Sequence, residues 1–206
     1  RDIVPEGVQV LPSVWSMRRK QDLVTNLVTK YKARLNLHGG KQELGVNYFD
    51  TYAPVVTWMA IRLCLILAII NKWHLRQIDF VMAYPQAPIE CDMYMSLPQG
   101  VATWVGRAKQ KALKLLQNIY GQKQAGRVWN EFLLQKLKEI GFQQSDVNSC
   151  VLFKDQIIFI LYVDDGIFMS PSKKLIDETL HQIRNELKLK VDNQGYPSDY
   201  VGVNIK

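Results

Sequence analysis

The 206-residue sequence has few cysteines and no long hydrophobic run. Its three cysteines, Cys64, Cys91 and Cys150, are odd in number, far apart and without a C-x-x-C spacing. This argues against a disulfide framework or a zinc site and favours free thiols in a reducing compartment. The longest apolar run, Leu63 to Ile70, is too short to cross a membrane, and no charged-then-apolar leader opens the chain. We therefore expect neither membrane insertion nor secretion.

Several catalytic and metal-binding patterns are also missing. His38, His74 and His181 have no metal-ligand spacing, and no G-x-S-x-G, Walker or G-x-G-x-x-G pattern occurs. Hard oxygen donors are then the remaining metal ligands, and sites made of carboxylates alone suit Mg²⁺ or Mn²⁺.

Positive charge is in excess. The net charge is +7 and the isoelectric point is about 9.3, which favours a polyanionic partner, although two solvated basic faces would give the same composition. The basic residues form two groups along the chain: Arg18, Arg19, Lys20, Lys30, Lys32 and Arg34, and then Arg107, Lys109, Lys111, Lys114, Lys123 and Arg127.

The most unusual stretch is IIFILYVDDGIFMS, from Ile157 to Ser170, an apolar ribbon with Asp164 and Asp165 in its middle. A carboxylate in apolar surroundings costs several kcal/mol unless it is paired, protonated or metal-bound. No Lys or Arg lies within the ribbon to pair with it, so a cation site is one interpretation. The other is that Asp165-Gly166 forms a two-residue hairpin turn with both acids at a wet tip. The two interpretations are compatible.

A third acid, Asp79, lies in the short predicted strand around Leu75 to Val81. Taken alone, it is more typical of an acid paired with a nearby Arg76. If it lies opposite Asp164, three acids converge and repel one another unless a cation is present.

The remaining patterns predict an α+β fold with an antiparallel sheet backed by helices. They place a hairpin within Val8 to Leu37, an irregular segment through Pro54, and a helix capped by Thr57 that is apolar on nearly every side and so lies deep in the core. Further predicted elements are a strand in CDMYMSLPQG, a helix from Trp129 to Ile140 ended by Gly141, a strand at Val151 to Lys154, a helix opened by Pro171 and Ser172, and a final strand in DYVGVNIK.

Seven elements in order resemble the reverse transcriptases of copia-type LTR retrotransposons. They are YKARLNLHGG, APVVTWMAIRL, QIDFVMAY, YMSLPQG, IYGQKQAGRVWNEF, LYVDDG and YVGVNI, and they cover the chain from about Val14 to Ile205. The resemblance implies a single domain with polymerase fingers at about 1–73 and 85–118 and palm at about 74–84 and 119–206. It also implies a parent polyprotein whose thumb, RNase H, integrase and protease regions are absent from this sequence.

The resemblance further implies the catalytic residues. Asp79, Asp164 and Asp165 would hold two Mg²⁺ ions, or Mn²⁺, with the backbone carbonyl of Phe80 as a further ligand. Such ions lower the pKa of the primer 3′-hydroxyl and neutralise the leaving pyrophosphate.

Five further residues match nucleotide-binding positions of the family. Tyr84 matches the steric gate that excludes the ribose 2′-hydroxyl, and Tyr120 and Gly121 lie in the loop that backs the incoming nucleotide. The basic strand offers Lys32 or Arg34 to the triphosphate, and the sequence does not fix which of the two.

Some residues depart from the family pattern LYGLKQAP. Ile119, Gln122 and Gly126 replace its Leu, Leu and Pro, so we expect disturbed packing behind the nucleotide site and a looser turn. Gln99 resembles a nucleotide-contacting glutamine of retroviral enzymes, but it precedes IYGQKQAG and matches another copia element, so it is not assigned that role.

The function implied by the resemblance is RNA-directed DNA polymerisation, with an RNA or DNA template, a primer and dNTPs as partners and no membrane. The family also implies an intracellular, cytoplasmic location in a virus-like particle. Two alternatives stay open: an inactive retroelement relic that only binds nucleic acid, and a metal-dependent nuclease or phosphatase using the same carboxylates.

Overall fold

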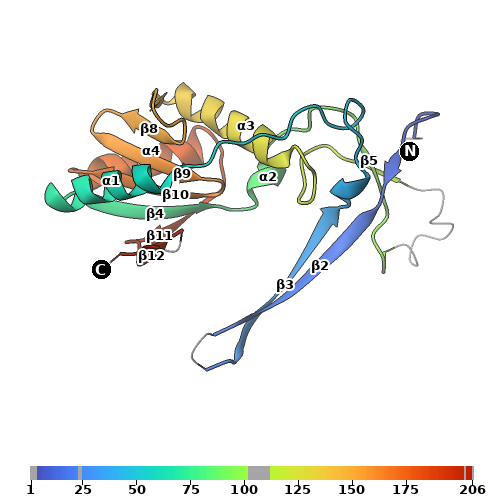
Figure 1. Cartoon of the computed structure of the whole chain (residues 1–206), viewed down its shortest axis with the longest axis horizontal. Helices are drawn as coiled ribbons and strands as arrows, with labels where there is room; N and C mark the ends of the chain where they lie inside the picture. Colours follow the sequence, from blue (N-terminus) through green and yellow to red (C-terminus); the bar gives the residue numbers. More distant parts are fainter. Residues whose placement is uncertain (1–3, 23–24, 102–111, 202, 206) are drawn as a thin grey trace. The chain divides into compact units, whose positions relative to one another are not determined.

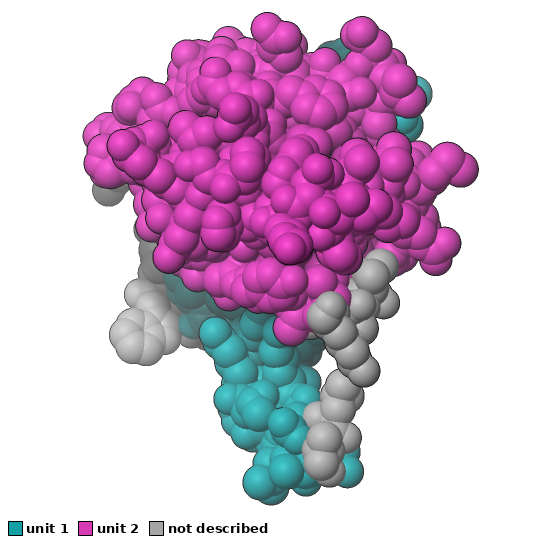
Figure 2. All heavy atoms as spheres, turned by 90° about the vertical axis from the view of Figure 1, so that its left-hand side faces the viewer, with its two compact units in different colours: residues 1–52, 87–128 teal, residues 53–86, 129–206 magenta. Residues whose placement is uncertain are grey.

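The computed structural model describes residues 4–22, 25–101, 112–201 and 203–205, and Arg107, Lys109 and Lys111 of the second basic group lie outside them. The chain forms two compact units, coloured separately in Figure 2. Unit 1 consists of Arg1–Tyr52 and Ala87–Val128, and unit 2 of Ala53–Gln86 and Trp129–Lys206. Each unit is therefore assembled from two separate stretches of chain. The structure contains both helices and strands, and this mixture agrees with the predicted α+β class.

Unit 2 is built on a six-stranded sheet in the order β11-β4-β10-β9-β8-β7 (Figure 1). Every pairing in it is antiparallel. The sheet therefore has two faces, with successive residues of each strand pointing to opposite sides. The strands are β4 (His74–Phe80), β7 (Gln143–Gln144), β8 (Val151–Lys154), β9 (Ile157–Tyr162), β10 (Asp165–Ser170) and β11 (Val191–Gly195).

One face of this sheet packs against α1 (Trp58–Ile70). Ile160 of β9 and Met169 of β10 belong to the same buried cluster as four side chains of the helix: Ile61, Cys64, Leu65 and Ala68. The Thr57 hydroxyl accepts a hydrogen bond from the Ala60 N–H at 3.3 Å, which confirms the predicted N-cap.

The prediction that α1 lies deep in the core was wrong. Only one side of the helix is buried, and the other carries exposed apolar side chains such as Met59, which is 81% exposed, and Ile70, which is 72% exposed. A helix that is apolar all round gives no periodic signal of which side meets the sheet, so burial on every side was the natural inference.

The opposite face is covered by α3 (Ala125–Glu139) and α4 (Lys173–Asn185). Trp129 of α3 packs edge-on against Phe80 of β4, with ring centroids 5.4 Å apart. The two helix boundaries suggested by sequence are confirmed: Gly141 follows α3 with a φ of 94°, and the Ser172 hydroxyl caps α4 by accepting from the Leu175 N–H.

Unit 1 contains a long antiparallel hairpin of β2 (Ser13–Gln21) and β3 (Val28–Leu37), as the sequence predicted. A smaller sheet joins β1 (Val10–Leu11), β5 (Tyr94–Ser96) and β6 (Ala112–Lys114) in the order β1-β5-β6. The core of this unit is small and consists of Leu11, Leu37, Met93, Met95 and Leu115.

Buried amides supplement that small core. The Gln42 side chain, only 4% exposed, donates to the Gln124 Oε1 at 2.9 Å and accepts from the Lys123 N–H at 2.8 Å. Gln124 Nε2 in turn donates to the Asn47 carbonyl at 3.3 Å. These bonds join the segment after η1 (Gly39–Lys41) to the loop before α3.

Two short elements complete the fold. Helix α2 (Ala83–Gln86) follows β4, and a pair of strands, β12 (Asp199–Tyr200) and β13 (Val203–Asn204), ends the described chain where a single strand was predicted. Among the described helices, none is both long and apolar enough to cross a membrane.

Candidate active site

Asp79 and Asp165 lie directly opposite each other on neighbouring strands. The antiparallel register of β4 and β10 pairs these two residues, so both side chains project from the same face of the sheet. Asp164 precedes β10, and its carbonyl accepts a hydrogen bond from the Phe80 N–H at 2.7 Å. The structure therefore brings the ends of the two acid-bearing strands together in unit 2.

The hairpin turn lies two residues earlier than the sequence suggested. Tyr162 pairs with Asp165, so Val163 and Asp164 form the turn, and Val163 has a positive φ of 57°. The prediction of an Asp165-Gly166 turn was wrong. Gly166 lies within β10, where an added Cβ would come 2.4 Å from the Phe159 ring. Close packing, and not a turn, therefore requires this glycine.

Arg76 does not serve as the partner suggested for Asp79. It is three positions away along β4 and so projects from the opposite face of the sheet. Its guanidinium is 3.5 Å from the carboxylate of Asp177 on α4. The alternative of a local Arg76–Asp79 pair therefore has no support in the strand geometry.

Trp129 connects the two acid-bearing segments, and the sequence reading assigned it only a core role. Its indole N–H donates to the Val163 carbonyl at 2.8 Å, while its ring packs against Phe80. It is 1% exposed. The helical spacing correctly indicated burial, but spacing carries no information about a hydrogen bond to a turn 34 residues away.

Tyr84 lies on α2, half-buried. Burial raises the pKa of its phenol, and the charge of Asp164 raises it further. This electrostatic coupling indicates that the Tyr84 ring lies near the turn that carries Asp164.

The donor set fits a hard divalent cation in its chemistry. Carboxylate and carbonyl oxygens are the ligands that Mg²⁺ prefers, and Asp192 of β11, which lies opposite Asp79 on its other side, extends the row of acids. In the part of the chain that the structure describes, however, no three His, Cys, Asp or Glu side chains converge closely enough to form a metal cage.

Unit 1 contains the two residues that the sequence analysis predicts to contact the triphosphate, Lys32 and Arg34. Lys32 and Arg34 project from the same face of β3, and the Arg34 guanidinium lies over the Tyr120 ring, 5.2 Å from its centroid. The structure thus brings Arg34 and Tyr120 together, and Lys32 lies two residues from Arg34 along β3.

Lys32 belongs to a row of cations that spans both strands of the hairpin. Arg18 is opposite Lys32 and Lys20 is opposite Lys30, so these four side chains and Arg34 share one face. The pKa of Lys32 is lowered, first by the charge of Lys20 and then by burial and the other cations. Like charges placed opposite each other destabilise a hairpin, so this face suits a polyanion.

The backbone conformation and close packing at position 121 require a glycine, whether or not a ligand binds there. The φ of Gly121 is 89°, and an added Cβ would lie 2.2 Å from the Leu37 carbonyl oxygen. The Leu37 N–H also donates to the Tyr120 carbonyl at 2.9 Å. The glycine therefore lets the Tyr120 loop pack against the end of β3.

The departures from the family pattern are accommodated. Gln122 is 6% exposed, and its Oε1 accepts from the Ile119 N–H at 2.9 Å, while its buried Nε2 has no hydrogen-bond partner among the described residues. Gly126 lies in the first turn of α3. The expected disturbance therefore takes the form of one unpaired amide donor.

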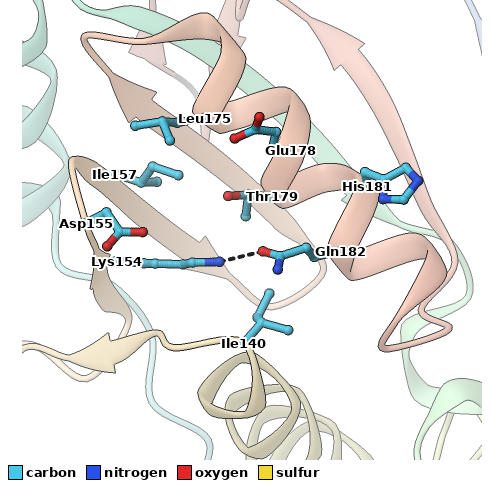
Figure 3. Close-up of a pocket in the computed structure, with 9 residues that line it drawn as sticks. All are labelled: Ile140, Lys154, Asp155, Ile157, Leu175, Glu178, Thr179, His181 and Gln182. Atoms are coloured by element: carbon cyan, nitrogen blue, oxygen red, sulfur yellow. Dashed lines mark hydrogen bonds between the residues drawn. The ribbon is translucent and has the colours of Figure 1, made fainter.

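A separate groove of about 640 Å³ lies on unit 2, between the β8–β9 turn and α4 (Figure 3). Lys154 reaches across it and donates to the Gln182 side chain, and both signs of charge line it. None of the predicted site residues is among those that line it.

Comparison with known proteins decides the family. Residues 3–206 match the family described as reverse transcriptase (RNA-dependent DNA polymerase). The chain belongs to this family. It is of the copia type, because its curated relatives are the polyproteins of such transposons.

Three relatives illustrate the match. The chain is 31% identical over 192 residues to the retrovirus-related Pol polyprotein from transposon TNT 1-94 of Nicotiana tabacum, covering 91% of this chain and 14% of the relative. It is 31% identical over 192 residues to that from transposon RE1 of Arabidopsis thaliana, covering 90% of this chain and 13% of the relative. It is 27% identical over 209 residues to the transposon Ty1-ER2 Gag-Pol polyprotein of Saccharomyces cerevisiae, covering 96% of this chain and 11% of the relative. The chain thus spans between 11% and 14% of the length of these three polyproteins.

Proposed function

We propose that this reverse transcriptase chain catalyses RNA-directed DNA synthesis, adding dNTPs to a primer 3′-hydroxyl with two Mg²⁺ ions. The observation that carries the proposal is the pairing of Asp79 with Asp165 on one face of the sheet, with Asp164 in the adjoining turn. Unit 2 would then be the palm and the β2–β3 hairpin part of the fingers.

In this proposal Asp79, Asp164 and Asp165 would hold the ions, with the Phe80 carbonyl as a further donor. Bound there, the ions would acidify the primer hydroxyl and neutralise the pyrophosphate that leaves. The protein's own part is to hold the acids in place. The Phe80 N–H and the Trp129 indole do so by bonding to the carbonyls of Asp164 and Val163.

Five residues are proposed to contact the nucleotide. Tyr84 would exclude a ribose 2′-hydroxyl. Arg34, which already lies over Tyr120, would contact the triphosphate, and Lys32 would take part through the cation row. Tyr120 and Gly121 would form the wall behind the nucleotide.

Primer extension on an RNA template, with and without Mg²⁺, tests the proposal. We expect Mg²⁺-dependent incorporation of dNTPs, and we expect Asp164→Asn to lower it more than 100-fold, because outer-shell partners of metals alone are worth about 10- to 100-fold. Asp155→Asn is the matched control, since Asp155 is also an acid in a hairpin turn of unit 2, the one between β8 and β9.

Full activity of Asp164→Asn would refute the catalytic assignment. Metal-dependent cleavage of nucleic acid without incorporation would favour a nuclease. Salt-sensitive binding with neither reaction would indicate a nucleic-acid-binding relic.

A further inference from the structure

Gln86 bonds to two chain segments that are far apart in sequence. It is the last residue of α2, two positions after Tyr84, and its side-chain amide contacts the backbone of Val81 and of Lys190. Lys190 is 104 residues away and immediately precedes β11. All of these residues belong to unit 2.

The amide acts as an added peptide group at the edge of the sheet. Its Nε2 donates to the Val81 carbonyl at 2.8 Å and to the Lys190 carbonyl at 3.0 Å, and its Oε1 accepts from the Lys190 N–H at 2.7 Å. The Val81 N–H also donates to the Lys190 carbonyl, at 3.0 Å. Gln86 therefore continues the β4–β11 ladder one step beyond Phe80 and Val191.

These bonds close a strained turn. Met82 lies between Val81 and α2 with a φ of 52°, a conformation that costs a residue with a side chain of order 1 kcal/mol or more. Such strain persists only where the surroundings fix it. Gln86 bonds to Val81 on one side of the turn and comes from α2 on the other, so it fixes both ends.

Tyr84 is carried by this turn. Because α2 has only four residues, its own hydrogen bonds do little to fix its direction, and the Gln86 amide ties it to the sheet. A shift of α2 would move the Tyr84 ring away from the turn of Asp164.

We propose that Gln86 is a positioning residue: its amide holds α2 so that Tyr84 discriminates between deoxyribonucleotides and ribonucleotides. The inference rests on the proposed function, because the discrimination exists only if the chain polymerises. A purely structural role would lower stability and leave the sugar preference unchanged.

The test measures kcat/KM for each dNTP and for the matching rNTP in full-length chains. Gln86→Leu removes all three side-chain hydrogen bonds, and we expect it to lower the dNTP-to-rNTP ratio about tenfold, the scale of one to two lost hydrogen bonds. Gln144→Leu is the matched control. Gln144 Nε2 also donates to a turn carbonyl of unit 2, that of Ser149 at 3.0 Å, and we expect its removal to leave the ratio unchanged.

A double-mutant cycle shows whether Gln86 acts through Tyr84. Tyr84→Ala alone should lower the ratio, and adding Gln86→Leu to it should lower the ratio little further, because the gate is already gone. Additive losses would overturn the inference. If Gln86→Leu does not fold, Gln86→Glu replaces it in the cycle, since it retains the acceptor for the Lys190 N–H and loses both donated bonds.

A readout independent of activity separates the two proposals. With 3-fluorotyrosine at position 84, Gln86→Leu should shift or broaden its ¹⁹F resonance, and Gln144→Leu should not. If the unaltered chain incorporates no dNTP, the proposed function is refuted. If an active Gln86→Leu chain shows an unchanged ¹⁹F resonance or an unchanged dNTP-to-rNTP ratio, the inference about Gln86 is refuted.

Discussion

The two units keep their structure by different means. Unit 2 has a broad sheet with apolar side chains on both faces, including the stacked rings of Phe159 and Phe168, whose centroids are 4.2 Å apart. Unit 1 has a small apolar core, buried amides around Gln42, and a hairpin with cations facing one another across its strands. Substitutions that change volume should therefore act most strongly in unit 2, and substitutions that change charge should act most strongly in unit 1.

The largest effect should follow Gly166→Ala. Its new methyl group would overlap the Phe159 ring, which is fully buried and stacked on Phe168, so the ring has no room to move. We expect a loss of about 1–3 kcal/mol in the free energy of unfolding, measured by urea denaturation. Gly40→Ala in unit 1 is the control, because its added Cβ would meet only the end of the exposed His38 ring. Equal losses for the two variants would contradict the comparison.

A smaller effect should follow Trp129→Phe. A smaller aromatic ring replaces the buried indole, so the bond to the Val163 carbonyl and some packing volume are lost. We expect a loss of about 1–2 kcal/mol in stability, together with slower primer extension at little changed KM for dNTP. Trp15→Phe is the control in unit 1. Its indole donates to the Gln99 carbonyl at 3.1 Å but is exposed, and its removal should change stability by less than about 0.5 kcal/mol. Equal losses of stability in the two variants would show that burial does not determine how much an indole hydrogen bond contributes.

The smallest change in stability should have the opposite sign. Lys20→Glu places an acid opposite Lys30 and beside Lys32, and we expect it to raise stability by about 0.2–1 kcal/mol while weakening nucleic-acid binding and its dependence on salt. Arg19→Glu makes the same change of charge on the other face, opposite Tyr31, and should not stabilise the hairpin.

The gain from Lys20→Glu should depend on pH. The pKa of Lys32 is lowered in the folded chain, so its charged form is disfavoured there, and this penalty is fully present at neutral pH. It is relieved as the pH rises through the lysine range, around pH 10. The stability difference between Lys20→Glu and the unaltered chain should therefore shrink as the pH rises, and a constant difference would contradict this explanation.

The sequence predicted local structure well and contacts between distant segments poorly. The caps Thr57 and Ser172 could be read directly, because capping is local. The turn was misplaced because Asp165-Gly166 has good turn chemistry, and only the position of Phe159 in the fold shows why the glycine is needed inside a strand.

The same contrast between local signals and contacts of distant segments holds for the candidate site. Motif order singled out Asp79, Asp164 and Asp165 as candidates, but the register that pairs Asp79 with Asp165 across β4 and β10 became visible only in the fold. The bonds made by Trp129 and Gln86 join residues 34 and 104 positions apart, and no periodicity records such pairs.

The interleaving of the two units has a genetic consequence. Each unit draws on two stretches of the chain, separated by a stretch that belongs to the other. No uninterrupted piece of the coding sequence can therefore supply one unit without including part of the second, and a frameshift near the middle of the stretch that encodes these residues would leave both incomplete. The sheet that carries Asp79 and Asp165 and the hairpin that carries the row of cations are therefore inherited together and lost together.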